Sequence, residues 1–212
     1  MENQLRKISI TEALNELKLY DSKINKSIQN GKFIGSAKTT SDRIGVQSKE
    51  NFERLAKSDY QSVNDLILNR SKLKSSIVNS NAITKVNING TEMTVAEAIE
   101  RKSSIVYEQN LLHILKQQYN DASNTVLREN KKVDEQVNKL LETLVGKDSE
   151  KKITKEDQEA IEKPYRDKNE FSLVDPMNLY EEIQKLEAKI DGFNSNVNTA
   201  LVLSNATTFI EI

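Results

Sequence analysis

Apolar residues recur at helical spacing along most of the chain, and short breaks separate the helices that they predict. A short strand is expected at Ile8–Thr11, followed by a helix that ends near Asn30-Gly31. A second helix begins near Lys49, and a third covers residues 95–145, which contain no Gly or Pro. At about 1.5 Å per residue the third helix is roughly 75 Å long. Helices of that length are typical of coiled coils and bundles.

Two stretches break this pattern and are predicted to be insertion-like loops. Residues 31–48 hold three of the six glycines together with several Ser and Thr residues. Residues 146–174 are charged and irregular, with one short helix expected to start at Thr154. A fourth helix is then expected to start at Asp175-Pro176 and to contain Gly192, which costs about 1 kcal/mol relative to Ala.

The clearest local signal is a β-hairpin. The β-prone run Thr84–Ile88 and the returning run Thr91–Thr94 flank Asn89-Gly90, the dipeptide of a type I′ turn. Because two runs this short pair well only across such a turn, residues 84–94 predict one antiparallel hairpin.

Three helix starts carry capping residues. Ser9 with Glu12, and Thr94 with Glu97, have the spacing of a capping box, in which the hydroxyl and the carboxylate bond the free amides of the first turn. Asp175 is a favourable N-cap before Pro176, and Val174 is predicted to staple to Leu179.

Two segments of the chain resemble two others. Val78–Ile88 aligns without gaps to Val202–Ile212 with six of eleven residues identical, and Ser9–Leu14 parallels Thr94–Ile99. The chain therefore contains, twice, a capped helix, a loop, a helix, the motif Ser-Asn-Ala-x-Thr and a strand. We expect a single domain of residues 1–212 with pseudo-repeats at 8–88 and 93–212. The predicted fold class is mainly α, an elongated bundle of four long helices (a duplicated helical hairpin) with a small β-hairpin or sheet at one end.

The repeated motif lies where a helix is expected to end and a strand to begin. Its residues are Ser80, Asn81, Ala82 and Thr84 in the first copy and Ser204, Asn205, Ala206 and Thr208 in the second. We expect Asn to adopt the left-handed conformation, Ala to allow close packing and Thr to favour the strand. The two strands would then pair in one small sheet. The alternative is a polar binding site built from the Asn and Thr residues of both copies.

Composition excludes several chemistries. Without Cys there is no disulfide, thiol enzyme or cysteine zinc site, and a single His excludes a two-histidine metal centre within one chain. Hydrophobic residues make up 36 %, few for a compact globule of 212 residues, so partner subunits are expected to complete the core. The N-terminus is polar and no apolar run approaches a membrane span, so we expect a cytoplasmic protein without membrane contact.

Charge gives no overall reason to bind nucleic acid, because the net charge is −1. Residues 1–80 carry 14 basic and 9 acidic residues, a net +5, whereas residues 81–212 carry 17 and 23, a net −6. This asymmetry favours head-to-tail or self-complementary association, with uneven helix surfaces as the alternative.

No catalytic constellation is recognisable. The glycine-rich stretch from Gly31 to Thr39 lacks the second glycine of a phosphate-binding loop, since Ser36 stands there. His113 lies on the long helix between leucines without an evident polar partner. We therefore expect no enzyme, no catalytic, cofactor-binding or metal-binding residues and no cofactor.

Several of these residues together resemble a known family. Asn81-Ala-Ile-Thr84, the Asn-Gly hairpin, Thr94-Val-Ala-Glu97-Ala98 and the ending Asn205-Ala-Thr-Thr208 are similar to the DIP1984 family, whose members are named septicolysin-like. The resemblance covers most of the chain except residues 31–55 and 146–170. Ala206 stands where the family usually carries Trp, which puts any role of that aromatic residue in doubt.

The resemblance implies a helical bundle with a small hairpin that self-associates, without an agreed activity and with relatives in phage-like contexts. The first functional hypothesis is therefore a non-enzymatic, self-associating structural protein, with a phage virion or phage-related component as its context. A septicolysin-like membrane-active toxin is the second. A protein-binding adaptor acting through loops 31–48 and 146–174 is the third.

Overall fold

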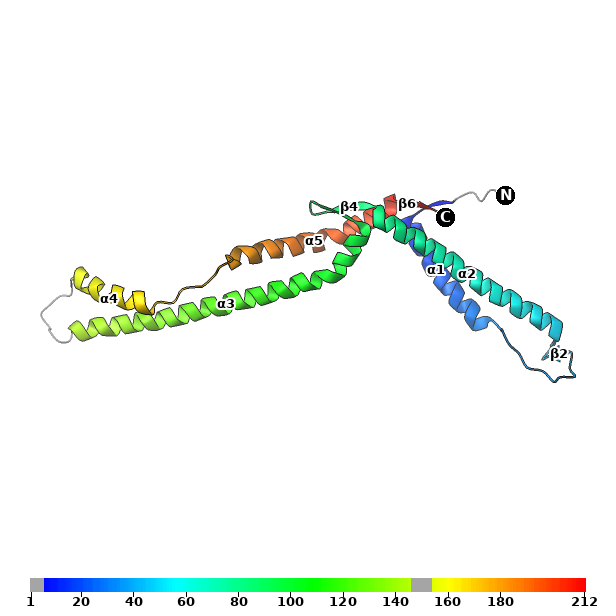
Figure 1. Ribbon diagram of the computed structural model, residues 1–212, viewed down its shortest axis with the longest axis horizontal. Coiled ribbons are helices and arrows are strands. Elements are labelled where there is room, and N and C mark those ends of the chain that lie inside the picture. Colours follow the sequence, from blue (N-terminus) through cyan, green and yellow to red (C-terminus); the bar gives the residue numbers. More distant parts are fainter. Residues whose placement is uncertain (1–5, 146–153) are drawn as a thin grey trace. The chain divides into compact units, whose positions relative to one another are not determined.

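The structure is a computed structural model that describes residues 6–145 and 154–212, and it is mainly helical with small antiparallel strand pairs (Figure 1). The predicted fold class is confirmed. The helices are α1 (Ile10–Asn30), α2 (Lys49–Ile83), α3 (Val95–Val145), α4 (Lys155–Asn169) and α5 (Leu179–Thr207). The strands are β1 (Lys7–Ser9), β2 (Arg43–Ile44), β3 (Gln47–Ser48), β4 (Lys85–Ile88), β5 (Thr91–Thr94) and β6 (Phe209–Glu211).

The chain divides into two compact units where the sequence suggested one domain. Unit 1 is Met1–Ser103 with Gly192–Ile212, and unit 2 is Ser104–Asp191. Helices α3 and α5 each contribute residues to both units. Each unit is described by itself below.

The core of unit 1 lies between α1 and α2 and reaches the strands. One face of α1 presents Ile10, Ala13 and Leu17, which pack with Leu73 and Ile77 of α2. Ile8 of β1 and Ile210 of β6 complete the same buried cluster. Ile10 and Ile77 are 2 % and 1 % exposed, and Ala13 is fully buried, so a larger side chain at position 13 has no free volume.

The strand pairing confirms the predicted hairpin of β4 and β5 and differs from the sequence analysis for β6. Strand β1 pairs antiparallel with β6, with Ile8 opposite Ile210, and β4 pairs antiparallel with β5. The expectation that β4 and β6 pair with each other in one sheet is therefore wrong. Each strand that follows a motif pairs instead with the strand that leads into the first helix of the other repeat. This exchange gives both strands a partner within unit 1.

The first insertion-like loop contains structure that composition did not reveal. Strands β2 and β3 pair antiparallel across Gly45, whose φ of 59° suits a residue without a side chain. Ser48 then caps α2, because its hydroxyl accepts a hydrogen bond from the Asn51 backbone N–H. In the second loop, α4 begins after Thr154 as predicted, whereas residues 146–153 lie outside the described part.

The start of α5 differs from the prediction. The helix begins at Leu179 rather than at Pro176, because Asn178 adopts a left-handed backbone with φ of 53°. Asp175 still stabilises the first turn, since its carboxylate accepts a hydrogen bond of 2.7 Å from the Leu179 backbone N–H. The predicted staple is wrong, because Val174 is 94 % exposed.

Unit 2 is built from α3 and α5 running antiparallel, followed along α3 by α4 (Figure 1). Glu108 pairs with Lys189 at 3.0 Å, and further along α3 the Tyr119 ring lies 5.9 Å from the Tyr180 ring. Near α4, Arg166 pairs with Asp134 of α3 at 2.8 Å. On either side of Asp134, Val133 and Val137 are buried at 6 % and 2 % exposure.

Candidate functional site

The two repeat junctions, Ser80–Thr84 and Ser204–Thr208, are the places where each motif ends its helix and a strand begins. They have the same backbone hydrogen bonds. The Thr84 and Thr208 N–H groups donate to the carbonyls of Ser80 and Ser204, each at 2.9 Å. The carbonyl of Thr84 accepts from Val95 N–H at 2.8 Å, and that of Thr208 accepts from Ile10 N–H at 2.9 Å. Each motif therefore ends its own helix and fixes the start of the first helix in the other repeat.

The motif asparagines do not adopt the predicted conformation. Asn81 and Asn205 lie inside the last turns of α2 and α5, and the non-glycine residues with positive φ in the described part are Asn89 and Asn178. The expectation of a left-handed Asn is therefore wrong. The caps are extended residues, as Thr84 shows with φ of −72° and ψ of 125°. A left-handed residue is not needed at these helix ends, because an extended cap leads directly into a strand.

The other motif residues occupy matching environments. Ser80 and Ser204 are both 8 % exposed, whereas Ala82 and Ala206 face solvent. Among the described residues no hydrogen bond joins Asn81 or Thr84 to the side chains of the second copy's Asn205 and Thr208. A shared polar pocket formed by these four residues stays a hypothesis.

Both first helices of the repeats begin with a capping box. The Ser9 N–H donates to the Glu12 carboxylate at 2.8 Å, and the Thr94 N–H donates to Glu97 at 2.7 Å. The hydroxyls of Ser9 and Thr94 accept from the backbone N–H groups of the same glutamates. These backbone hydrogen bonds, assisted by the hydroxyls, lower the pKa of Glu12 and of Glu97. The carboxylates are thus helix caps, which is a structural rather than a catalytic use.

The hairpin tip contacts α5 at the glycine that interrupts its apolar stripe. Asn89 and Gly90 have φ of 51° and 81°, as a type I′ turn requires, and Asn87 Oδ1 accepts from the Gly90 N–H at 2.9 Å. A Cβ atom added to Gly192 would lie 2.1 Å from Asn89 Nδ2. Gly192 is therefore explained by the close approach of the β4–β5 turn.

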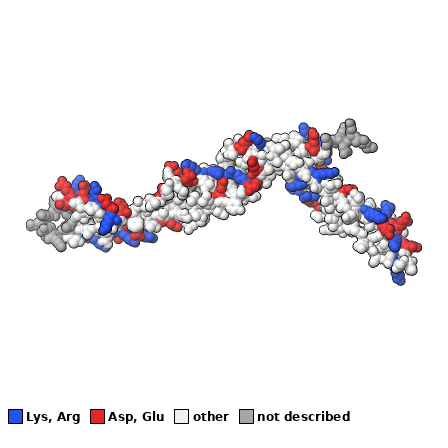
Figure 2. Space-filling model, in the orientation of Figure 1, with Lys and Arg blue, Asp and Glu red and all other residues white. Residues whose placement is uncertain are grey.

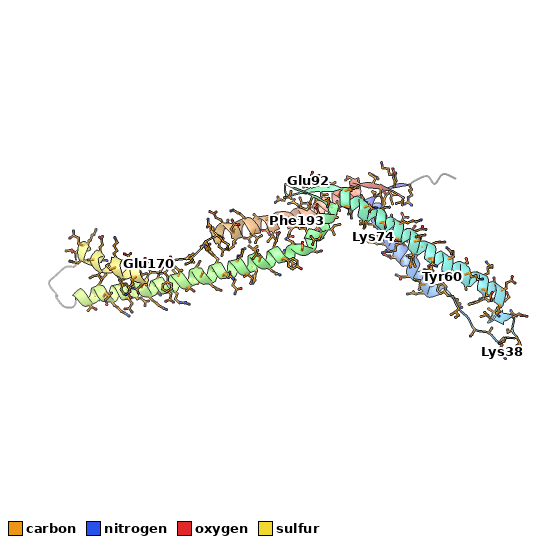
Figure 3. All side chains as sticks on the ribbon, viewed as in Figure 1. Lys38, Tyr60, Lys74, Glu92, Glu170 and Phe193 are labelled. Atoms are coloured by element: carbon orange, nitrogen blue, oxygen red, sulfur yellow. The ribbon has the colours of Figure 1, made fainter. Side chains whose placement is uncertain are left out.

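Among the described residues, each unit has an open groove outside the junctions. In unit 1 a groove of about 560 Å³ is lined mainly by the apolar residues of the first loop and of α2, with Phe33 and Tyr60 in edge-to-face contact at 6.3 Å. Lys38 and Tyr60, labelled in Figure 3, mark this end of unit 1. In unit 2 a groove of about 470 Å³ lies between α3 and α5.

The unit 2 groove has an apolar floor and a charged rim. The floor is formed by Leu111, Leu115, Met177, Leu179 and Leu186, and the rim by Glu182, Lys185 and Lys189. Sequence analysis missed this site, although a signal was present. Tyr107, Leu111 and Ile114 follow the i, i+4, i+7 spacing of a second apolar stripe on α3 and are 75 %, 52 % and 45 % exposed.

Charged side chains cover much of the visible surface in both signs, with uncharged areas between them (Figure 2). Among the described residues no group of three or more His, Asp or Glu side chains is placed to hold a metal ion. His113 is exposed on α3. Within the same described residues, no helix has the length and apolar content that crossing a membrane requires.

Comparison with known proteins gave no relatives. No family model matches the chain, and no curated protein and no solved structure matches it.

Proposed function

We propose that this chain is a non-enzymatic structural protein that self-associates through the outer faces of its helix pairs. The resemblance to septicolysin-like proteins is part of the same proposal, and a phage-related assembly is the context that it suggests. The junction residues, caps and hairpin turn all have structural roles in this account.

The observation that supports the proposal is the apolar surface left outside the helix pairs. On α3, Tyr107 is 75 % exposed and Leu111 is 52 % exposed, at positions one helical turn apart. Scattered apolar residues are ordinary on a protein surface, whereas a stripe along one helix beside a groove is typical of an interaction face.

The test is the mass of the chain in solution. Light scattering on a sizing column, across a hundredfold concentration series, is expected to give a multiple of the 24.1 kDa chain mass at the higher concentrations. A mass of one chain at every concentration would overturn the proposal.

A second candidate function is a protein-binding adaptor that acts through the first loop. The observation that favours it is the exposure of Ile34 and Val46, at 90 % and 91 %, beside the unit 1 groove. In this account Ile34→Ser with Val46→Ser abolishes capture of a partner protein without changing the mass of the chain itself. If the double variant captured the partner protein as well as the unsubstituted chain does, the adaptor function would be excluded.

A further inference from the structure

We propose that Asn89-Gly90 is a self-modification site, at which the chain converts Asn89 to aspartyl and isoaspartyl residues without an enzyme, at a rate that Asn87 controls. The site lies in the β4–β5 turn, at the point where this turn meets α5. It is separate from the exposed faces that self-association uses, so neither proposal depends on the other.

The reaction needs only the turn and water. The Gly90 backbone nitrogen loses its proton to solvent and attacks the side-chain carbon Cγ of Asn89, so that a C–N bond forms and Nδ2 leaves as ammonia. Glycine hinders this attack least, because it has no side chain. Water then opens the resulting cyclic imide at one of its two C–N bonds. Opening at Cγ gives aspartyl, and opening at the main-chain carbonyl gives isoaspartyl.

The turn leaves both reacting groups accessible. Asn89 and Gly90 are exposed, and among the described residues no hydrogen bond holds the Asn89 carboxamide. The Gly90 N–H donates to Oδ1 of Asn87 at 2.9 Å, and Asn87 is itself exposed. Exposed side chains change rotamer within nanoseconds. This hydrogen bond therefore withholds the nitrogen for only part of the time.

The chain contains a second Asn-Gly pair, Asn30-Gly31, which provides an internal comparison. The Gly31 N–H donates to the backbone carbonyl of Ser27 at 2.9 Å, at the end of α1. A Cβ atom added to Gly31 would lie 2.3 Å from Cζ of Phe33, so this ring lies against the glycine. Releasing the Gly31 nitrogen requires the last turn of α1 to open, whereas releasing the Gly90 nitrogen requires only one side chain to rotate.

The products change the contact between the turn and α5. Nδ2 of Asn89 lies where a Cβ atom on Gly192 would be only 2.1 Å away, and both products lose this amide nitrogen. Isoaspartyl also adds a main-chain carbon atom between Ile88 and Thr91, which are paired across the turn. Because a short hairpin turn requires a specific backbone conformation, we expect the modified turn to lose its packing against α5.

The experiment follows both asparagines of the purified full chain by peptide mass spectrometry during incubation at neutral pH. We expect Asn89 to convert about fivefold faster than Asn30, a factor that corresponds to one hydrogen bond of ordinary strength. In concentrated urea the two rates should become equal, because the fold no longer distinguishes the sites. Equal rates in the folded chain would overturn the proposal. A difference that persisted in urea would overturn it too, because the local sequence would then decide the rate.

Variants of Asn87 test its control of the rate. Asn87→Ala removes the acceptor of the Gly90 N–H and should raise the rate at Asn89 about fivefold, with the rate at Asn30 unchanged. Asn87→Asp keeps an acceptor oxygen and should retain the slow rate. An unchanged rate at Asn89 in Asn87→Ala would overturn the role of Asn87.

The matched control is Glu92→Gln on the other strand of the hairpin (Figure 3). It removes the ion pair of 2.7 Å with Lys85 and leaves the Gly90 hydrogen bond in place. We expect it to leave the rate at Asn89 unchanged. A rise equal to that in Asn87→Ala would show that general loosening of the hairpin sets the rate, and would overturn the control by Asn87.

Discussion

The two repeat junctions share their backbone hydrogen bonds and differ in the side chains that pack beside them. In both, a Thr carbonyl accepts from the first residue of the other repeat's helix, and a capping box starts that helix. The residues that the two repeats share are thus the ones that join each helix to a strand and start the next helix. Ser80 and Ser204, equally buried at 8 %, belong to this common frame.

The surrounding side chains have diverged. Ile77 of the first repeat is 1 % exposed, whereas Leu201 at the corresponding position of the second repeat is half-buried. Leu17 is 7 % exposed, whereas its counterpart Lys102 reaches Asn198 with a 2.8 Å hydrogen bond. The comparison teaches that hydrogen-bonded geometry constrains the duplicated motif more tightly than packing does. At these two positions the first repeat is the more apolar, although Val95, Ala98 and Val197 of the second repeat are also buried, at 2 %, 0 % and 2 % exposure.

The largest expected effect comes from deleting equivalent core side chains. Ile77→Ala leaves a cavity in a fully buried site and should lower the free energy of unfolding by about 2–5 kcal/mol. Leu201→Ala removes a half-buried side chain and should cost roughly 1 kcal/mol. Urea denaturation followed by circular dichroism measures both. Equal losses would show that the two junctions do not differ in packing.

The capping residues should behave alike in the two repeats. Ser9→Ala and Thr94→Ala each remove a hydroxyl that accepts from a first-turn N–H, and each should cost about 1 kcal/mol of unfolding free energy. The same urea titrations measure this. A large difference between the two variants would contradict the structural equivalence of the two helix starts.

The glutamates of the capping boxes predict a pH dependence. Their pKa values are lower in the folded chain than the ordinary 4.5, because the Ser9 and Thr94 N–H groups donate to the ionised carboxylates. Their contribution to stability is therefore complete above pH 4.5 and is lost as the pH falls through the folded pKa. Glu12→Gln and Glu97→Gln should be less stable than the unsubstituted chain at pH 7, and the difference should shrink as the pH falls below 4.5. A stability difference that grew as the pH fell would contradict the predicted lowering of the two pKa values.

A double-mutant cycle tests the contact between the turn of the hairpin and Gly192 of α5. Gly192→Ala should gain about 1 kcal/mol from helix propensity, but the new Cβ would overlap the Asn89 side chain. We expect the gain to be absent in the unsubstituted background and to appear in an Asn89→Gly background. Glycine is compatible with the φ of 51° at position 89. Equal effects in both backgrounds would exclude the contact.

The smallest effect is expected from the ion pair between Asp21 and Arg70, which joins α1 to α2. The corresponding positions of the second repeat hold Val106 and Asn194, so that repeat forms its hairpin without this pair. Both charged groups are exposed, and such pairs are screened by salt. Asp21→Asn should therefore change the urea midpoint less than any substitution above, and not at all in 1 M salt.

The sequence predicted the elements whose causes are local. Asn89-Gly90 specifies its turn by backbone conformation, and the uninterrupted residues 95–145 form one helix because nothing in them breaks it. Ser9 with Glu12 predicted a capping box from spacing alone, and the structure has it. Each of these depends on residues within four positions of one another.

Features that depend on contacts between distant parts of the chain were not predictable in the same way. Which strand β6 pairs with is decided by the fold of unit 1, and no residue of β6 encodes β1 as its partner. The start of α5 moved because Asn178 tolerates positive φ, an alternative that the Asp175-Pro176 pattern does not exclude. The groove in unit 2 requires knowing which face of α3 meets α5, since Leu111 and Leu112 look alike in the sequence.

The most direct test of the central claim uses the absence of cysteine from the chain. Ile114→Cys places a single thiol on the exposed apolar stripe of α3, whereas Asn120→Cys places one on an exposed position of the same helix, about 120° away from residue 114. With a short thiol-reactive cross-linker, we predict a covalent dimer for Ile114→Cys and mainly monomer for Asn120→Cys. Equal yields for the two variants, or no dimer from Ile114→Cys, would contradict self-association through this face.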